Sequence, residues 1–72
     1  MNHSEILRLQ KYLQDKFGTR KLNIALRKEV KDSAEVMIDG EFIGLIYRDE
    51  DEGEVSYDFN MAILEMDLPP AA

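Results

Sequence analysis

The chain contains no cysteine, no tryptophan, two prolines and a single histidine among its 72 residues. Without cysteine it can form no disulfide, and with His3 as the only histidine it has too few ligands for a structural zinc site. No apolar run approaches the roughly 18 residues needed to cross a bilayer, and the first residues do not resemble a secretory signal. We therefore expect a cytoplasmic protein with no membrane association.

Residues that could carry chemistry are also few. Ser4, Ser33 and Ser56 have no candidate general base beside them, and no glycine-rich phosphate loop is present. The carboxylate run 49–54 lacks the glycine position and the flanking helices of an EF-hand, which favours a solvated loop and leaves only a weak divalent-cation response open. The sequence predicts no catalytic residue, no cofactor, no metal site and no small-molecule substrate, and we expect that the protein is not an enzyme.

Charge is divided along the chain. Eight of the nine basic residues lie at or before Lys31, whereas twelve of the fifteen acidic residues lie at or after Asp32, within a net charge of −6. The average charge opposes binding to nucleic acid or anionic lipid, and only a local basic patch reverses this. The length predicts a single small domain over residues 1–72, in which Pro69-Pro70 ends the regular structure and residues 69–72 form a flexible tail.

An amphipathic helix is predicted at the start of the chain. Asn2 and Glu5 have the spacing of a capping box, Ser4 is a competing cap, and Gly18 supplies the usual stop. Between these signals, four apolar residues recur at helical spacing and form one stripe that faces a core: Ile6, Leu9, Leu13 and Phe17. The helix is therefore expected to bury one side only.

Four strands are predicted after the helix. Alternation over Lys21–Arg27 indicates the first strand, and Asp39-Gly40 has the composition of a type I′ turn between a second strand, near 34–38, and a third. A charged loop over 48–54 then precedes a fourth strand. The predicted fold class is α+β, with one N-terminal helix packed on a four-stranded, mostly antiparallel sheet as an α-β-β-β-β meander. After Met61 the pattern permits a bulge, a strand buried on both faces or a short terminal helix.

The tight turn also predicts which side chains share a face of the sheet. It pairs Val36 with Ile43, and the other members of that face are then Ala34, Ile38, Leu45, Tyr47, Tyr57 and Phe59. Because this face is almost wholly apolar, we expect the helix to pack on it.

The opposite face of the sheet carries our main hypothesis for function. Met37, Phe42 and Ile46 fall on it and form an apolar patch that the helix does not cover. The alternatives are that the last residues of the chain fold back across the patch, or that its members are scattered among polar residues. We interpret the patch as the binding surface of a protein-protein interaction domain, for an unidentified protein partner or for a second copy of the chain.

A basic patch is the alternative basis for function. The helix end, the first strand and the following loop contain Lys16, Arg20, Lys21, Arg27, Lys28 and Lys31. If these side chains converge, they form a site for RNA or for an acidic protein partner. The net negative charge and the lack of aromatic residues interleaved with the basic ones argue against nucleic acid.

Several stretches resemble a short bacterial family of about this length with no assigned function. The resemblance rests on the pattern EFIG at 41–44 and SYDFNMAILEMDL at 56–68, with Phe17-Gly18 and residues 33–36 as further matches. It implies a free-standing, bacterial, intracellular domain, and it transfers no catalytic motif.

Overall fold

The computed structural model describes residues 1–71 and begins with helix α1, His3–Phe17. The predicted capping box is present: the Asn2 side chain accepts a hydrogen bond from the Glu5 N–H at 2.8 Å, and the Glu5 carboxylate accepts one from the Asn2 N–H at 3.1 Å. Gly18 ends the helix in the left-handed conformation. Both predicted ends of the helix are therefore confirmed.

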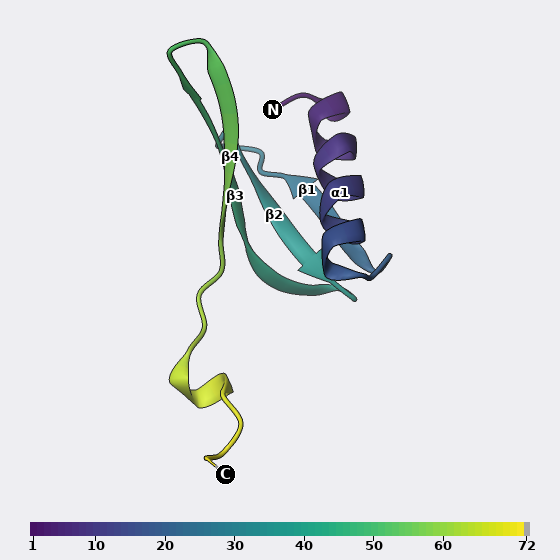
Figure 1. The fold of residues 1–72 in the computed structure, drawn as a ribbon, viewed down its shortest axis with the longest axis vertical. Helices are drawn as coiled ribbons and strands as arrows, with labels where there is room; N and C mark the ends of the chain where they lie inside the picture. Colours follow the sequence, from purple (N-terminus) through teal and green to yellow (C-terminus); the bar gives the residue numbers. More distant parts are fainter. Residues whose placement is uncertain (72) are drawn as a thin grey trace.

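Four antiparallel strands follow α1 and form one sheet in chain order, β1-β2-β3-β4 (Figure 1). Their bounds are Leu22–Leu26 for β1, Ser33–Ile38 for β2, Glu41–Asp51 for β3 and Glu54–Asn60 for β4. The predicted α+β fold, a helix followed by a four-stranded meander, is confirmed.

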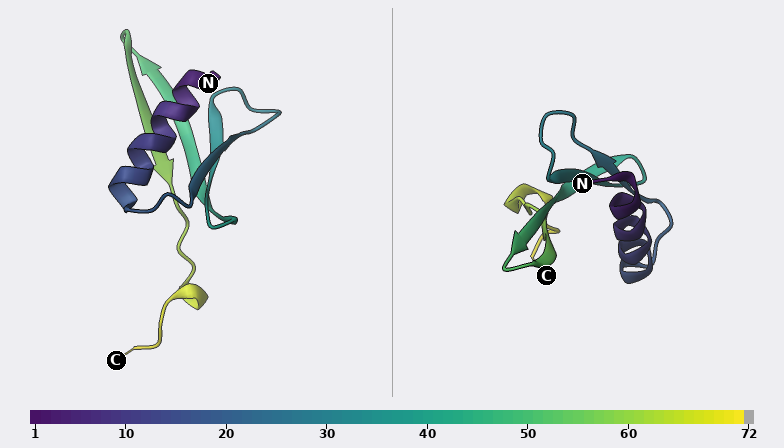
Figure 2. Two further views of the ribbon diagram at one scale, coloured as in Figure 1. Left: turned by 90° about the vertical axis from the view of Figure 1, so that its right-hand side faces the viewer. Right: turned by 90° about the horizontal axis from the view of Figure 1, so that it is seen from above.

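Helix α1 packs along one side of the sheet, against β1 (Figure 2). Two glutamines of α1 bond to the backbone of this strand. Gln10 Oε1 accepts a hydrogen bond from the Ile24 N–H at 3.0 Å, and Gln14 Nε2 donates one to the Leu22 carbonyl at 2.9 Å. At the opposite edge of the sheet, β4 pairs with β3 only. The helix therefore covers the β1 side of the sheet, and β4 is the edge strand that it leaves uncovered.

The β2–β3 and β3–β4 hairpins close with two-residue turns, whereas residues 27–32 connect β1 to β2. Asp39 and Gly40 have φ angles of 54° and 80°, as a type I′ turn requires, so the predicted turn is confirmed. The predicted loop over 48–54 is wrong, because β3 continues to Asp51 and a second turn of this kind follows at Glu52 and Gly53, with φ angles of 52° and 81°. Glutamate rarely adopts a positive φ, so Glu-Gly is a weaker sequence signal than Asp-Gly.

A β-bulge changes the register that the first turn sets. Met37 pairs with Phe42 as that turn requires, but Val36 pairs with Gly44 and not with Ile43, so β3 has one residue more than β2 at this point. Because side chains alternate along a strand, one extra residue moves every later side chain of β3 to the other face.

The bulge therefore corrects the predicted faces of β3. Ile46 is buried, with 1% of its surface exposed, so its predicted place on the uncovered face is wrong. Leu45 and Tyr47 lie on the outer face instead, and their predicted place under the helix is also wrong. Tyr57 and Phe59 keep their predicted helix-side face, because Phe59 now pairs with Ile46.

The core is small. Helix α1 contributes two buried apolar residues and the sheet contributes the rest, which together are Ile6, Leu13, Leu22, Ile24, Ala34, Val36 and Ile46. Leu9, Tyr57 and Phe59 pack at its margin and are half-buried. Phe17, predicted as the last core anchor of the helix, is 49% exposed and meets Phe59 edge-on, with the ring centroids 6.1 Å apart. The predicted burial of Phe17 is therefore wrong.

Beyond Asn60 the chain leaves the sheet and runs away from it (Figure 1). Within residues 61–71 it forms one short 3₁₀ helix, η1, Glu65–Asp67, and every residue of this segment is exposed. The predicted tail, 69–72, belongs to this segment, and its last residue, Ala72, lies outside the described residues. None of the helices formed by residues 1–71 has the length and apolarity to traverse a membrane.

Candidate functional site

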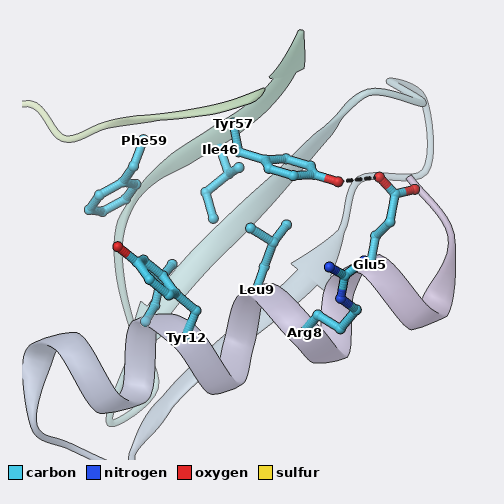
Figure 3. A pocket seen from close by; sticks show the side chains of 8 residues that line it. Glu5, Arg8, Leu9, Tyr12, Ile46, Tyr57 and Phe59 are labelled. Atoms are coloured by element: carbon cyan, nitrogen blue, oxygen red, sulfur yellow. Dashed lines mark hydrogen bonds between the residues drawn. The ribbon is translucent and has the colours of Figure 1, made fainter. Parts of the chain in front are cut away.

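A groove opens between α1 and β4 on the helix side of the sheet (Figure 3). It exists because α1 packs on β1 and leaves the inner face of the β3–β4 hairpin uncovered. The groove has a volume of about 480 Å³ and is lined by Glu5, Arg8, Leu9, Tyr12, Leu13, Ile46, Tyr57 and Phe59. Concave, largely apolar surfaces of this size are typical ligand-binding sites.

Most of the groove lining is apolar. Ile46 of β3 and Leu13 of α1 belong to the buried core and form its base. Leu9 points from α1 toward the strands, and Phe59 points from β4 toward the helix (Figure 3). Tyr12 is 58% exposed and directs its hydroxyl group toward Phe59. Residues 1–71 thus form an apolar channel that is open to solvent along one side.

The helix side of the groove carries positive charge. Arg8 lines the groove, and Lys16 Nζ lies 5.6 Å from the centroid of the Tyr12 ring in a cation–π contact. Neither cation makes an ion pair within residues 1–71, whereas Lys11 pairs with Asp15 at 3.3 Å. Arg8 and Lys16 are therefore available to an acidic group of a ligand.

A network of three polar side chains closes one end of the groove. The Glu5 carboxylate accepts hydrogen bonds from Arg48 Nε at 3.0 Å and from the Tyr57 hydroxyl, the second of which is drawn in Figure 3. Glu5 lies in the first turn of α1, Arg48 on β3 and Tyr57 on β4. The network therefore ties the helix to the hairpin and holds the two walls of the groove together.

These hydrogen bonds shift the pKa values of the network. The Tyr57 hydroxyl, the Asn2 backbone N–H and Arg48 all favour the charged carboxylate, and they lower the pKa of Glu5 to about 2. The same bond to Glu5, together with burial, raises the pKa of Tyr57. At neutral pH Glu5 is therefore charged and Tyr57 is protonated, so neither group is poised to exchange a proton with a ligand. The network suits a fixed structural connection better than acid–base chemistry.

The acidic tip of the β3–β4 hairpin spreads its carboxylates. Alternation along β3 sends Asp49 and Asp51 to one face and Glu50 to the other, where Glu50 pairs with Arg48 at 3.2 Å. Over residues 1–71, no group of three or more potential ligand side chains is placed to hold a metal ion. The tip therefore carries concentrated charge without a cage of metal ligands.

The bulge divides the partner surface that the sequence predicts. Met37 and Phe42 are paired on the outer face of the sheet, where Phe42 is 55% exposed. Ile46 lies on the other side of the sheet, in the core and at the base of the groove, so its assignment to the outer surface is wrong. Of the three predicted residues, the structure brings two together.

The predicted basic patch is split between the two ends of β1. Three of its residues, Lys16, Arg20 and Lys21, lie where α1 leads into β1, and three, Arg27, Lys28 and Lys31, lie in the loop between β1 and β2. The five residues of β1 separate the two groups by about 16 Å. The six side chains therefore do not form one surface, although Lys16 contributes to the rim of the groove.

The sequence pattern does not reveal the groove, because it assigns Leu9, Tyr57 and Phe59 to a closed core. The groove could have been predicted from the relative widths of one helix and a four-stranded sheet. A helix is about 10 Å across, whereas four strands spaced about 4.8 Å apart make a sheet more than 14 Å wide. One helix cannot cover such a face, so a partly exposed Tyr12 on the helix flank marks the margin of an open groove.

Fold and site together define the class: a small α+β domain with an open apolar groove beside an edge strand. The chain belongs to the family described as Protein of unknown function (DUF3126), whose model matches residues 5–67. The resemblance to a short family without an assigned function is thereby confirmed. No curated protein and no solved structure shows significant similarity to the chain. The family match includes the groove and also the segment from Asn60 through η1.

Proposed function

We propose that this domain is a non-enzymatic protein-interaction module whose binding surface is the groove between α1 and β4. The observation that carries the proposal is the apolar lining of this groove, which stays open to solvent within residues 1–71. Concave apolar surfaces that a folded domain leaves exposed mark binding sites. The proposal places the domain in the cytoplasm of a bacterium, as the resemblance of the sequence implies.

The surroundings of the groove favour an extended segment of a protein as its ligand. The groove is an open channel, whereas sites for small molecules enclose most of the ligand surface. At its rim, β4 pairs with β3 only, so its outer N–H and C=O groups can bond to the backbone of an added segment. Arg8 adds a cation on the opposite wall, and Lys16 adds a second one at the rim, beside Tyr12. A segment that combines apolar residues with a carboxylate fits these features best.

Peptide selection tests this function. A random peptide library displayed on phage is selected against the full chain, immobilised at low density so that copies do not meet. We expect enrichment of apolar peptides whose binding is lost with Tyr12→Glu and retained with Leu7→Glu. Both substitutions replace an exposed apolar residue of α1, but only Tyr12 lines the groove.

Two results of the selection would contradict the proposal. The first is a failure to enrich any peptide that binds the wild-type domain. The second is equal binding of the selected peptides to both variants, which would locate the contact elsewhere, for example on the outer face with Met37 and Phe42. Circular dichroism checks that both variants keep the fold, so a lost interaction reports on the groove.

A further inference from the structure

We propose that the groove receives the segment Met61–Leu68 of a second copy of the chain, so that two copies exchange these segments reciprocally. This segment is called the C-terminal arm below. The inference rests on the proposed function and deepens it, because it names the protein segment that the groove binds.

The C-terminal arm has the composition of a segment that is buried in an assembly. Its five large apolar side chains are each more than half exposed: Met61, Ile63, Leu64, Met66 and Leu68. The arm runs away from both the sheet and the helix, so residues 1–71 do not cover these side chains (Figure 1). The same chain thus carries an uncovered apolar segment and an uncovered apolar groove, and association of the two removes both surfaces from water.

The path of the chain favours the groove of another copy over its own. Strand β4 runs beside the groove and continues into the arm, so docking within one copy requires a reversal directly after Asn60. Residues 61–64, which follow Asn60 directly, contain none of the residues that favour tight turns, and the backbone at Leu64 is extended. An arm that points outward reaches a neighbouring copy without any such turn.

The length of the groove matches the apolar start of the arm. Along α1, the lining extends from Glu5 to Leu13, which is about 13 Å at a rise of 1.5 Å per residue. An extended chain advances about 3.3 Å per residue, so the groove accommodates about four residues. Residues 61–64 are four consecutive apolar residues, Met-Ala-Ile-Leu.

The charges of the arm and the groove are complementary. The arm contains two carboxylates, on Glu65 and Asp67, and no basic residue. The helix side of the groove carries Arg8 and Lys16, which make no ion pair within the described part of the chain. With residues 61–64 in the apolar channel, the carboxylates follow at its end and reach the basic helix surface.

Reciprocal exchange produces a closed dimer. Each copy has one arm and one groove. A two-fold axis therefore repeats the same arm–groove contact twice, and no arm or groove is left unpaired. The exchange covers two grooves and, from each arm, the three large apolar side chains within residues 61–64. A domain with so small a core gains stability from burial of this kind.

Sedimentation equilibrium of the full chain tests the exchange. We expect a dimer, and we expect Ile63→Glu in the arm and Tyr12→Glu in the groove each to raise its dissociation constant by about tenfold or more, since each introduces a charge into an apolar contact. Leu7→Glu, which makes the same change on α1 outside the groove, retains the dimer. Ile63 lies outside the sheet and the core, so its substitution leaves the fold intact, as circular dichroism will check.

Nuclear magnetic resonance then identifies the contact. In a mixture of ¹³C-labelled and unlabelled wild-type chains, isotope-filtered spectra report only contacts between copies. We expect such contacts between the methyl groups of Ile63 and Leu64 in one copy and the rings of Tyr12 and Phe59 in the other.

Three results would overturn the exchange: a monomer up to millimolar concentration, a dimer that Ile63→Glu leaves unchanged, or contacts between the arm and the groove of the same copy. Peptide selection separates this failure from failure of the proposed function. If selected peptides bind the groove of a chain that is monomeric, the domain is still an interaction module and only the identity of its ligand is wrong. If selection also fails, both proposals fall.

Discussion

Gly44 shows how one absent side chain shapes both the sheet and the groove. A Cβ atom at this position would lie 2.5 Å from the Asn60 carbonyl oxygen and 2.7 Å from Cε1 of Phe59. The Phe59 ring therefore occupies the space that a side chain at position 44 would fill, and from there it meets Phe17 edge-on. The glycine is what allows Phe59 to form the end of the groove.

The first prediction concerns this close approach. Gly44→Ala should destabilise the domain by about 1–3 kcal/mol, because the added methyl group meets a backbone carbonyl that cannot move without disturbing β4. Urea unfolding followed by circular dichroism measures the change. Ser56→Ala, at an exposed position of β4, is the control and should stay within about 0.5 kcal/mol of the wild type. If Gly44→Ala unfolds at the same urea concentration as the wild type, β4 does not lie this close to Gly44.

At the scale of elements, Glu5 joins three parts of the fold. Its carboxylate caps α1 through the Asn2 N–H and also bonds to Arg48 of β3 and Tyr57 of β4. The ionised form makes all of these bonds, so protonation weakens the connection between the helix and the hairpin.

The second prediction follows from the pKa of Glu5, which folding lowers from 4.5 to about 2. A carboxyl group whose pKa is lowered on folding stabilises the fold fully above the higher value, and this contribution disappears as the pH falls through the lower one. The difference in unfolding free energy between the wild type and Glu5→Gln should therefore be constant above about pH 4.5 and shrink toward pH 2. Denaturant unfolding across this pH range measures it. A difference that does not change with pH would mean that the carboxylate is not held in this network.

The elements also show which parts of the fold local sequence can predict. Asn2 with Glu5, and Asp39 with Gly40, satisfy backbone requirements within a few residues, and these caps and turns were predictable. The bulge was not predictable, because Ile43 and Gly44 both fit a strand. Which of the two lacks a partner on β2 depends on packing contacts with residues that are distant in the sequence. The register of β3 consequently required the three-dimensional structure.

The candidate site was predictable only in part. The period of two places Tyr57 and Phe59 on the helix side of the sheet, and the structure agrees. Whether that side is closed or open depends on where α1 lies across the sheet, and Gln10 and Gln14, which hold α1 over β1, show no distinguishing pattern in the sequence. The openness of the groove therefore could not be read from the residues that line it.

At the scale of the whole molecule, stability depends on very few buried side chains. A domain of this length typically has an unfolding free energy of about 4–11 kcal/mol. The core cluster contains seven apolar residues, and two of them, Leu13 and Ile46, also form the base of the groove. Ile46 is the more deeply buried of these two. Loss of that one side chain should therefore affect both folding and binding.

The third prediction is that Ile46→Ala costs about 2–5 kcal/mol, a large part of the total, because it leaves a cavity between α1 and the sheet. Phe42→Ala, at an exposed position of the outer face, should cost clearly less although it removes a larger side chain. Thermal and urea unfolding compare the two variants. Equal losses of unfolding free energy would indicate that Ile46 and Phe42 lie on the same face of the sheet, as the sequence alone predicts. That result would contradict the bulge.

The acidic tip of the hairpin has a consequence for solubility. An edge strand such as β4 is a template on which identical strands can stack into fibres. Here β4 contains Glu54 and Asp58 and no basic residue, and the adjoining turn adds further carboxylates, so two β4 edges that approach side by side bring charges of the same sign together. The repulsion opposes the lateral stacking of identical β4 strands, while the edge stays accessible to a neutral or basic segment. Because ions in solution screen it, this protection weakens as the salt concentration rises.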